Sequence, residues 1–180
     1  MAPDDTASGR SPRIRAALLA VLVLTTLASA GLLVWAVTTR GEAEEGQAQR
    51  EEIMSVGEQF MLRKETFGPD DLDDQGRLAD YDSSVGELIT PKLSSSFEEQ
   101  TRAIEQLVAK SGLESESDVY ATAVTGSDDD SADAIVVGDT VFKFTRSQSE
   151  TRSFRYHLTL VKTNGKWLVD SFEDVSGGQP

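Results

Sequence analysis

The spacing of apolar residues divides the chain into a membrane-type segment and a longer part with globular patterning. Ala16–Thr39 contains no charged residue in 24 positions. A helix of that length rises about 36 Å at ~1.5 Å per residue, which is enough to cross a hydrocarbon core of about 30 Å with some tilt. The sequence therefore predicts one transmembrane helix at residues 16–39.

Basic residues at the two ends of this segment indicate its orientation. Arg10, Arg13 and Arg15 precede it, whereas Arg40 follows it and is itself followed by acidic residues. Because positive charge is retained on the cytoplasmic side, the N-terminus is expected in the cytoplasm. We therefore expect a single-pass protein of the cell membrane whose C-terminal domain is extracytoplasmic.

A cleaved signal peptide is the alternative interpretation of the same segment. Its apolar region would be Ala16–Leu27, with Ala28-Ser29-Ala30 as a small-residue cleavage site. However, the apolar run continues through Gly31–Val37, so cleavage would leave an exposed apolar N-terminus. Both interpretations place the rest of the chain outside the cytoplasm, and they differ in whether it stays tethered.

Three helices are predicted after the membrane segment. The first covers about Ala48–Phe67 and the second about Asp80–Ile89, and Pro91 is expected to end the second. The third is predicted to begin near Ser95 or Ser96 with a capping box and to end at a C-terminal glycine, Gly112.

The period then changes to strict alternation, which is typical of half-buried strands. Four strands are expected, at Asp118–Thr125, Ala132–Thr145, Thr151–Thr163 and Lys166–Val175. Asn164-Gly165 is a two-residue hairpin signal, and Asp128–Ser131 marks a second hairpin tip. Helices followed by hairpin-linked strands predict an α+β domain, with three helices packed on a curved antiparallel four-stranded sheet.

These elements give a division into segments with very different charge. The predicted segments are a cytoplasmic basic tail (1–15), the transmembrane helix (16–39), a juxtamembrane linker (40–50), an extracytoplasmic α+β domain (51–175) and a disordered tail (176–180). The formal net charge is −14; residues 1–40 hold four Arg and two Asp, which leaves −16 on the remainder. A domain this acidic is a poor candidate for binding nucleic acid, because the phosphates need clustered basic side chains.

The absence of cysteine from the sequence excludes disulfides, thiolate chemistry and Cys-ligated zinc. The sequence also contains no GxSxG elbow, no glycine-rich phosphate loop and no HExxH. No catalytic or cofactor-binding residues are therefore assigned. The expected function is non-enzymatic, with proteins or apolar ligands as partners and a homodimer as one possible arrangement.

The order of elements and the last hairpin resemble a known family. The order is a basic tail, one span, three helices and four strands, and the last hairpin is Thr159–Phe172, in which Gly165–Phe172 is the most specific part. This pattern resembles the Mce-associated membrane proteins of actinobacterial envelopes, and Asp80-Tyr81-Asp82 gives weaker support. The resemblance implies a nuclear transport factor 2-like cone. The same layout occurs in the periplasmic assembly factor of type IV secretion systems.

The resemblance also implies a function. The chain would be an accessory subunit that stabilises or assembles an Mce-type lipid or sterol transporter, in contact with its substrate-binding subunits and permease. Two alternatives stay open, namely a cone domain that binds a small apolar ligand or acts as an enzyme, and an assembly factor of a secretion system.

An aspartate-rich loop raises the question of a calcium site. Asp71, Asp73 and Gln75 fall at the first, third and fifth positions of a calcium loop, with Gly76 at the turn and Asp82 at the last position. Glutamine at the fifth position and aspartate in place of the bidentate glutamate depart from that pattern. An acidic surface loop that caps the second helix is the simpler interpretation, so no metal site is assigned.

Two further sets of residues have competing interpretations. His157, the single histidine, is expected on the strand face opposite Phe154 and Tyr156, where it is either a surface residue or a general base in the cone. An apolar stripe on the helices either forms the core or lines a lipid pocket, and core is the commoner outcome at helical spacing. Its members are Phe60, Met61, Phe67, Phe97, Ile104 and Leu107.

Overall fold

The computed structural model describes residues 45–145 and 148–177. Contacts divide the chain into two units, Met1–Gln47 and Ala48–Pro180; of the first, the structure describes residues 45–47, which are helical. Within the described ranges no helix is long and apolar enough to span a bilayer. The span expected at Ala16–Thr39 lies outside these ranges.

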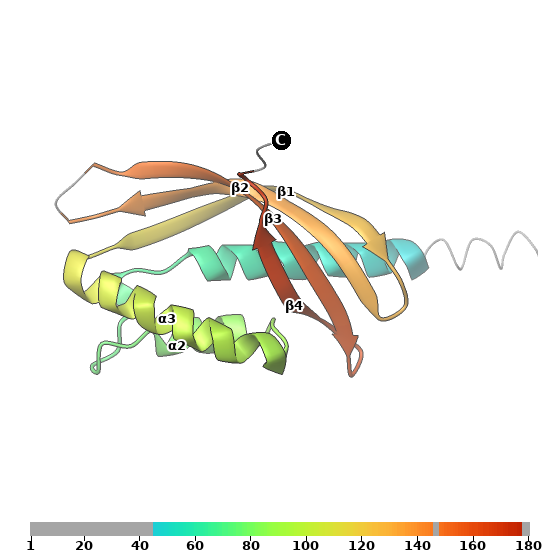
Figure 1. The fold of residues 1–180 in the computed structure, drawn as a ribbon, viewed down its shortest axis with the longest axis horizontal. Helices are drawn as coiled ribbons and strands as arrows, with labels where there is room; N and C mark the ends of the chain where they lie inside the picture. The colour runs from blue at the N-terminus through green and yellow to red at the C-terminus, as the bar shows by residue number, and fades with distance from the viewer. Residues whose placement is uncertain (1–44, 146–147, 178–180) are drawn as a thin grey trace, which may run out of the picture. The chain divides into compact units, whose positions relative to one another are not determined.

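Helices and strands follow one another in the order predicted for an α+β domain. The helical elements are residues 45–65, the short 3-10 helix η1 (Pro69–Asp71), α2 (Ala79–Gly86) and α3 (Pro91–Ser111). The strands are β1 (Glu114–Ser127), β2 (Ser131–Lys143), β3 (Glu150–Thr163) and β4 (Lys166–Asp174). The sheet is antiparallel in the order β1-β2-β3-β4, and the helices lie against one of its faces (Figure 1).

The hairpin turns confirm the predicted turn chemistry. Asn164 and Gly165 both have positive φ, 52° and 80°, as a two-residue turn between twisted strands requires. At the other tip, the backbone N–H of Asp128 donates to the carbonyl of Ser131 at 2.8 Å. The side chain of Gln49 donates to the Asp128 carbonyl at 2.7 Å and so fixes this tip to the first helix.

Two backbone bridges join the helical layer to the edges of the sheet. Phe67 and Ser115 exchange backbone hydrogen bonds of 3.0 and 2.7 Å at the start of β1. On the opposite edge, the N–H of Thr90 donates to the carbonyl of Val169 and the N–H of Val169 donates to that of Leu88. These bonds hold the segments that precede α2 and α3 in register with the sheet.

The core lies between the helices and the sheet. Its buried residues alternate along β2 and β3, as the period of two predicts. The largest fully buried side chains are Trp167, Phe60, Phe97, Ile53, Met61, Leu78, Leu158 and Leu160. The interpretation of Phe60, Met61, Phe67 and Phe97 as core residues is confirmed, whereas Leu107 is 53% exposed and its assignment to the buried stripe is wrong.

Several boundaries differ from the predicted ones. The chain is helical from residue 45, within the stretch expected to be a linker, because Glu, Gln and Ala favour helix and one glycine costs only about 1 kcal/mol. Pro91 begins α3 rather than ending α2, and the N-cap is Thr90, not Ser95 or Ser96. Proline suits the first helical turn, where its missing N–H would have no partner.

The C-terminal tail is partly held as well. Ser176, which was expected in a disordered segment, accepts a hydrogen bond from the backbone N–H of Arg155 at 2.7 Å. Its own N–H donates to Asp174 at 2.8 Å. Residues 178–180 lie outside the described ranges.

Candidate functional site

The aspartate-rich loop uses its carboxylates to support its own backbone. Asp71 accepts the N–H of Gly68 at 2.8 Å and closes η1. Asp73 accepts the N–H groups of Gln75 and Arg77 at 2.8 and 2.9 Å. The hydrogen bond from the Arg77 backbone is the main cause that lowers the pKa of Asp73. Gly76, with φ 74°, occupies the predicted turn position.

The proposed last calcium ligand points elsewhere. Asp82 lies in α2, where its carboxylate accepts the hydroxyl of the buried Thr101 from α3 at 3.4 Å. In residues 45–145 and 148–177, no group of three or more His, Asp or Glu side chains is placed to hold a metal ion. The structure therefore does not bring Asp71, Asp73, Gln75 and Asp82 together as a ligand set.

His157 lies on the face of the sheet that the helices do not cover. Its Nε2 is 3.4 Å from Oδ1 of Asp133 on β2, and Thr159 donates to the same oxygen at 3.2 Å. Both His157 and Asp133 are partly exposed. Because Phe154 and Leu158 face the core instead, His157 is outside the cone interior, and the hypothesis of a general base there is not supported.

An ion pair and two aromatic rings lie together at the end of the first helix. Lys64 and Glu65, at the end of the first helix, form an ion pair and are each 13% exposed. The ammonium group of Lys64 lies 4.9 Å from the ring centre of Tyr156 and 5.0 Å from that of Phe172. Such cation–π contacts are favourable in partly desolvated positions. No local sequence pattern predicts this cluster, because its rings come from strands far along the chain.

Aromatic side chains fill the space behind this ion pair. Phe60 contacts Phe172, with ring centres 5.5 Å apart, and Tyr156 lies 5.9 Å from Phe172. Burial, followed by the negative charges of Glu65 and Asp174, raises the pKa of Tyr156 to about 12. The phenol therefore stays protonated at neutral pH. Phe60, Tyr156 and Phe172 therefore form one aromatic cluster beside the ion pair.

The uncovered face of the sheet presents a rigid aromatic side chain. Tyr120 on β1 is 64% exposed, and its hydroxyl donates to Asp139 on β2 at 2.8 Å. This hydrogen bond raises the pKa of the Tyr120 hydroxyl. A hollow of about 310 Å³ lies beside it, and Gly138 and Arg155 are among the residues that line it. Exposed tyrosine and arginine beside a hollow are typical of protein contact surfaces.

Comparisons with known proteins identify the fold but no family. No protein-family model matches the chain. No curated protein matches it either. Among solved structures, it is similar to an IcmL-like type IV secretion system protein from Legionella pneumophila, with a TM-score of 0.57, 12% identity, and coverage of 73% of this chain and 95% of that chain.

Two further solved structures show the same architecture. The transfer protein TraH from the Gram-positive conjugative plasmid pIP501 has a TM-score of 0.52 and 12% identity, over 72% of this chain and 96% of that one. A periplasmic fragment of TraM has a TM-score of 0.52 and 11% identity, over 69% and 95%. This α+β domain therefore shares the fold of these three solved structures.

Proposed function

We propose that this chain is a non-enzymatic accessory subunit, anchored in the cell membrane, whose extracytoplasmic domain stabilises or assembles a multiprotein complex of the envelope. The observation that carries the proposal is the filled interior of the cone, where Phe60, Tyr156 and Phe172 pack together behind the Lys64–Glu65 ion pair. A domain whose interior is packed with its own side chains offers its surface to partners. His157, the single histidine, lies on that surface, away from the interior.

An Mce-type lipid or sterol transporter is the first candidate for the complex. The support is the resemblance of the final hairpin, in which Trp167 is fully buried in the core and Asn164-Gly165 forms the turn. In this proposal the membrane helix at Ala16–Thr39 fixes the subunit beside the permease, and the domain contacts the substrate-binding subunits.

A secretion or conjugation apparatus is the second candidate. It is favoured by the shared fold, since the similar solved structures include a type IV secretion system protein and a conjugative transfer protein. At 11–12% identity, this likeness supports a common architecture and leaves the partners to experiment.

Affinity purification tests the proposal directly. The tagged full-length protein would be isolated from its native membrane in mild detergent, with the untagged strain as control, and co-purifying proteins would be identified by mass spectrometry. Enrichment of Mce substrate-binding subunits and their permease supports the first candidate, and enrichment of secretion components supports the second. Recovery of the chain with neither set would contradict the accessory function.

A further inference from the structure

The domain carries an open groove at the end where α3 stops. Its volume is about 680 Å³, and its walls, which mix apolar and polar side chains, come from the η1 region, from α3 and from the segment after β2. We call it the end groove and define it by Pro69, Leu72, Val108, Gly112 and Phe144. Val108 is buried at its base, whereas Phe144 is 37% exposed. Apolar surface that water can reach in a hollow is typical of a binding site.

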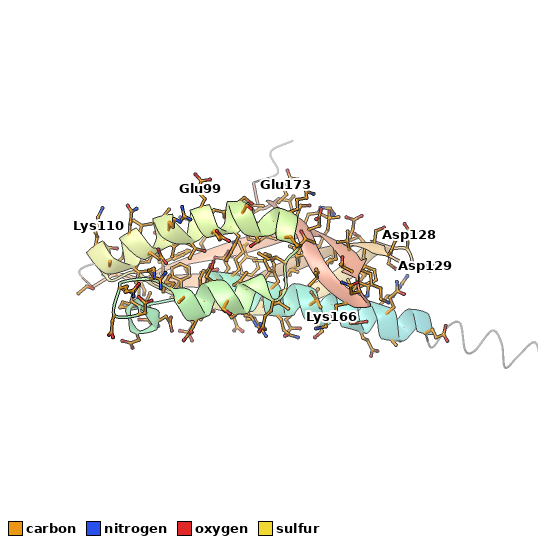
Figure 2. All side chains as sticks on the ribbon, turned by 90° about the horizontal axis from the view of Figure 1, so that it is seen from below. Glu99, Lys110, Asp128, Asp129, Lys166 and Glu173 are labelled. Carbon is orange, nitrogen blue, oxygen red and sulfur yellow. The ribbon has the colours of Figure 1, made fainter. Side chains whose placement is uncertain are left out.

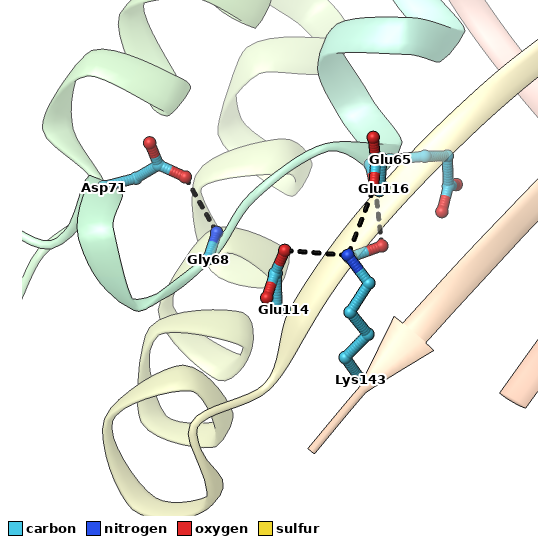
Figure 3. A network of polar contacts seen from close by, with 7 residues as sticks. Glu65, Gly68, Asp71, Glu114, Glu116 and Lys143 are labelled. Atoms are coloured by element: carbon cyan, nitrogen blue, oxygen red, sulfur yellow. Dashed lines mark hydrogen bonds and ion pairs between the residues drawn. The ribbon is translucent and has the colours of Figure 1, made fainter. Parts of the chain in front are cut away.

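An acidic border runs along one side of the end groove. A second hollow, of about 470 Å³, shares Pro69 with it and is lined by Asp70, Asp71, Glu114 and Glu116. Lys143 forms ion pairs of 3.0 and 3.1 Å with the two glutamates (Figure 3). Figure 3 also shows the hydrogen bond from Gly68 to Asp71.

The acidic border retains negative charge after its internal pairing. Its four carboxylates are opposed by Lys143 and by Lys110 on the groove wall, which leaves −2 among these six side chains. Asp70 is exposed and makes no hydrogen bond or ion pair with a described residue. A positively charged group beside the end groove would therefore meet an unpaired carboxylate.

We propose that the end groove and the acidic border bind a cationic amphipathic segment of a partner protein. An apolar side chain of the segment occupies the groove beside Phe144, and a Lys or Arg side chain pairs with Asp70. This inference rests on the proposed function, because it supplies a contact surface for an accessory subunit. It adds the chemistry of the partner to that function.

Charge excludes the other classes of occupant. In a twofold contact between two copies, each acidic border would face a second acidic border, and like charges brought together in an interface are unfavourable. Anionic lipid head groups would be repelled by the same carboxylates. A cationic segment is the partner whose charge complements this surface.

A peptide titration tests the chemistry of the site. The probe is a short fluorescent peptide of leucine and lysine, compared with the same peptide carrying glutamate in place of lysine. Both are titrated by anisotropy against the full-length protein in nonionic detergent, with empty micelles as the blank. We expect only the lysine peptide to bind.

Matched variants separate the site from the general acidity of the domain. Asp70→Lys changes the border, and Asp129→Lys makes the same change of charge at the β1–β2 tip, at the other end of the domain from Lys110 (Figure 2). Phe144→Ser removes the apolar contact, and Leu107→Ser is its control, at an exposed apolar residue outside the groove lining. We expect the groove variants to weaken binding about tenfold, corresponding to ~1.4 kcal/mol, while the controls stay within about twofold.

Salt dependence gives an independent readout. Raising the ionic strength weakens the contribution of Asp70 but leaves that of Phe144, because salt screens exposed charges and not apolar contacts. If Asp129→Lys weakens binding as much as Asp70→Lys, or if Phe144→Ser has no effect, the inference is wrong. Near-ultraviolet circular dichroism of each variant verifies that the domain remains folded.

Cross-linking in the native membrane identifies the occupant. A photoreactive amino acid replaces Phe144 in the full-length protein, with and without Asp70→Lys or Asp129→Lys. An adduct to a segment with apolar and basic residues, reduced by Asp70→Lys alone, supports the inference. An adduct to a second copy or to lipid, or no adduct, overturns it.

The two proposals fail in different ways. If affinity purification recovers no complex, the accessory function fails, whereas the peptide titration still decides the chemistry of the groove. If a complex is recovered equally well with Asp70→Lys and Phe144→Ser, the accessory function stands and the groove is not its contact surface.

Discussion

At the scale of single residues, the sheet depends on one position without a side chain. Gly138 in β2 is packed so closely that a Cβ atom there would lie 2.1 Å from the carbonyl oxygen of Asp118 and 2.6 Å from the ring of Phe154. The neighbouring strand backbone cannot move aside without breaking the pairing of β1 with β2. Close packing of three strands therefore requires glycine at this position.

Gly138→Ala is expected to destabilise the domain by about 2–3 kcal/mol, at the upper end of ordinary overpacking, because the clash is with backbone. The measurement is urea unfolding of the full-length protein in detergent. Gly126→Ala is the matched control, since a Cβ at Gly126 meets no atom within 4 Å. Equal effects of the two substitutions would contradict the packing argument.

Asp170 links the start of α3 to β4 through a charge. Its carboxylate accepts hydrogen bonds from Lys92 and from the hydroxyl of Thr90. The bond from Lys92 is the main cause that lowers the pKa of Asp170 below its ordinary value. A carboxyl group with a lowered pKa in the folded state stabilises the fold above its unfolded pKa, and this contribution is lost as the pH falls through the folded pKa.

Asp170→Asn is therefore expected to cost about 1–2 kcal/mol at pH 7, the contribution of a hydrogen-bonded charge. The difference from the unsubstituted protein should shrink as the pH falls below about 4, near the ordinary carboxyl pKa. Unfolding free energies measured from pH 7 to pH 3 test this. Asp129→Asn, at the exposed hairpin tip, should change stability by less than about 0.5 kcal/mol. A pH-independent effect of Asp170→Asn would contradict the assignment.

At the scale of elements, the start of α3 shows how tertiary contacts choose between competing caps. Ser95 and Ser96 satisfy the local capping-box pattern, but the helix begins four residues earlier, at Pro91. Thr90 is held by backbone pairing with Val169 and by its hydroxyl bond to Asp170. The sheet edge thus fixes the N-cap, and the serines become ordinary helical residues.

Thr90→Ala is expected to lower the free energy of unfolding by about 1–2 kcal/mol, because it removes an N-cap and a buried hydrogen bond. Thr90→Ser keeps the hydroxyl and should recover most of this loss. Ser96→Ala is the control, since the Ser96 hydroxyl is exposed and bonds only within its own turn. A larger effect of Ser96→Ala than of Thr90→Ala would restore the predicted capping box.

At the scale of the whole molecule, large side chains from the helices and the sheet pack together in one core. Phe60 is fully buried and contacts Phe172 across the interior. Trp167 and Phe97 are buried as well, so both layers contribute large side chains to the same space. This packing makes the space between the helices and the sheet a source of stability.

Phe60→Ala should therefore cost about 3–5 kcal/mol of stability, the range for truncation of a packed aromatic residue. Thermal unfolding of the full-length protein in detergent measures the loss. Leu107→Ala, which truncates an exposed apolar residue, should change stability by less than about 0.5 kcal/mol. Unchanged stability of Phe60→Ala would indicate that the interior is a ligand site rather than a packed core.

Local signals in the sequence were sufficient to predict the order and type of the helices and strands. Alternation along Phe154–Leu160 assigned the buried and exposed faces of β3, and Asn164-Gly165 located the last hairpin. Gly112, with φ 60°, ends α3 as its position predicted. These features depend on residues that are close in sequence. Their backbone geometry and burial can therefore be predicted without the rest of the fold.

Other features depended on contacts between residues far apart in the sequence. The bridge to Val169 chose Thr90 as the cap, and the exposure of Leu107 followed from the orientation of α3 on the sheet. The aspartates near Gly76 support loop and helix contacts, although their spacing resembled a calcium loop.

The sequence by itself determined an acidic α+β domain with four antiparallel strands. The spacing of apolar residues and the turn residues are local features of the sequence, and the net charge is a sum over it. The membrane span at Ala16–Thr39 and the Mce partners stay predictions. Only the tertiary structure decided that the interior is filled and that the end groove adjoins the acidic border, because Pro69, Val108 and Phe144 meet only when the helices close on the sheet.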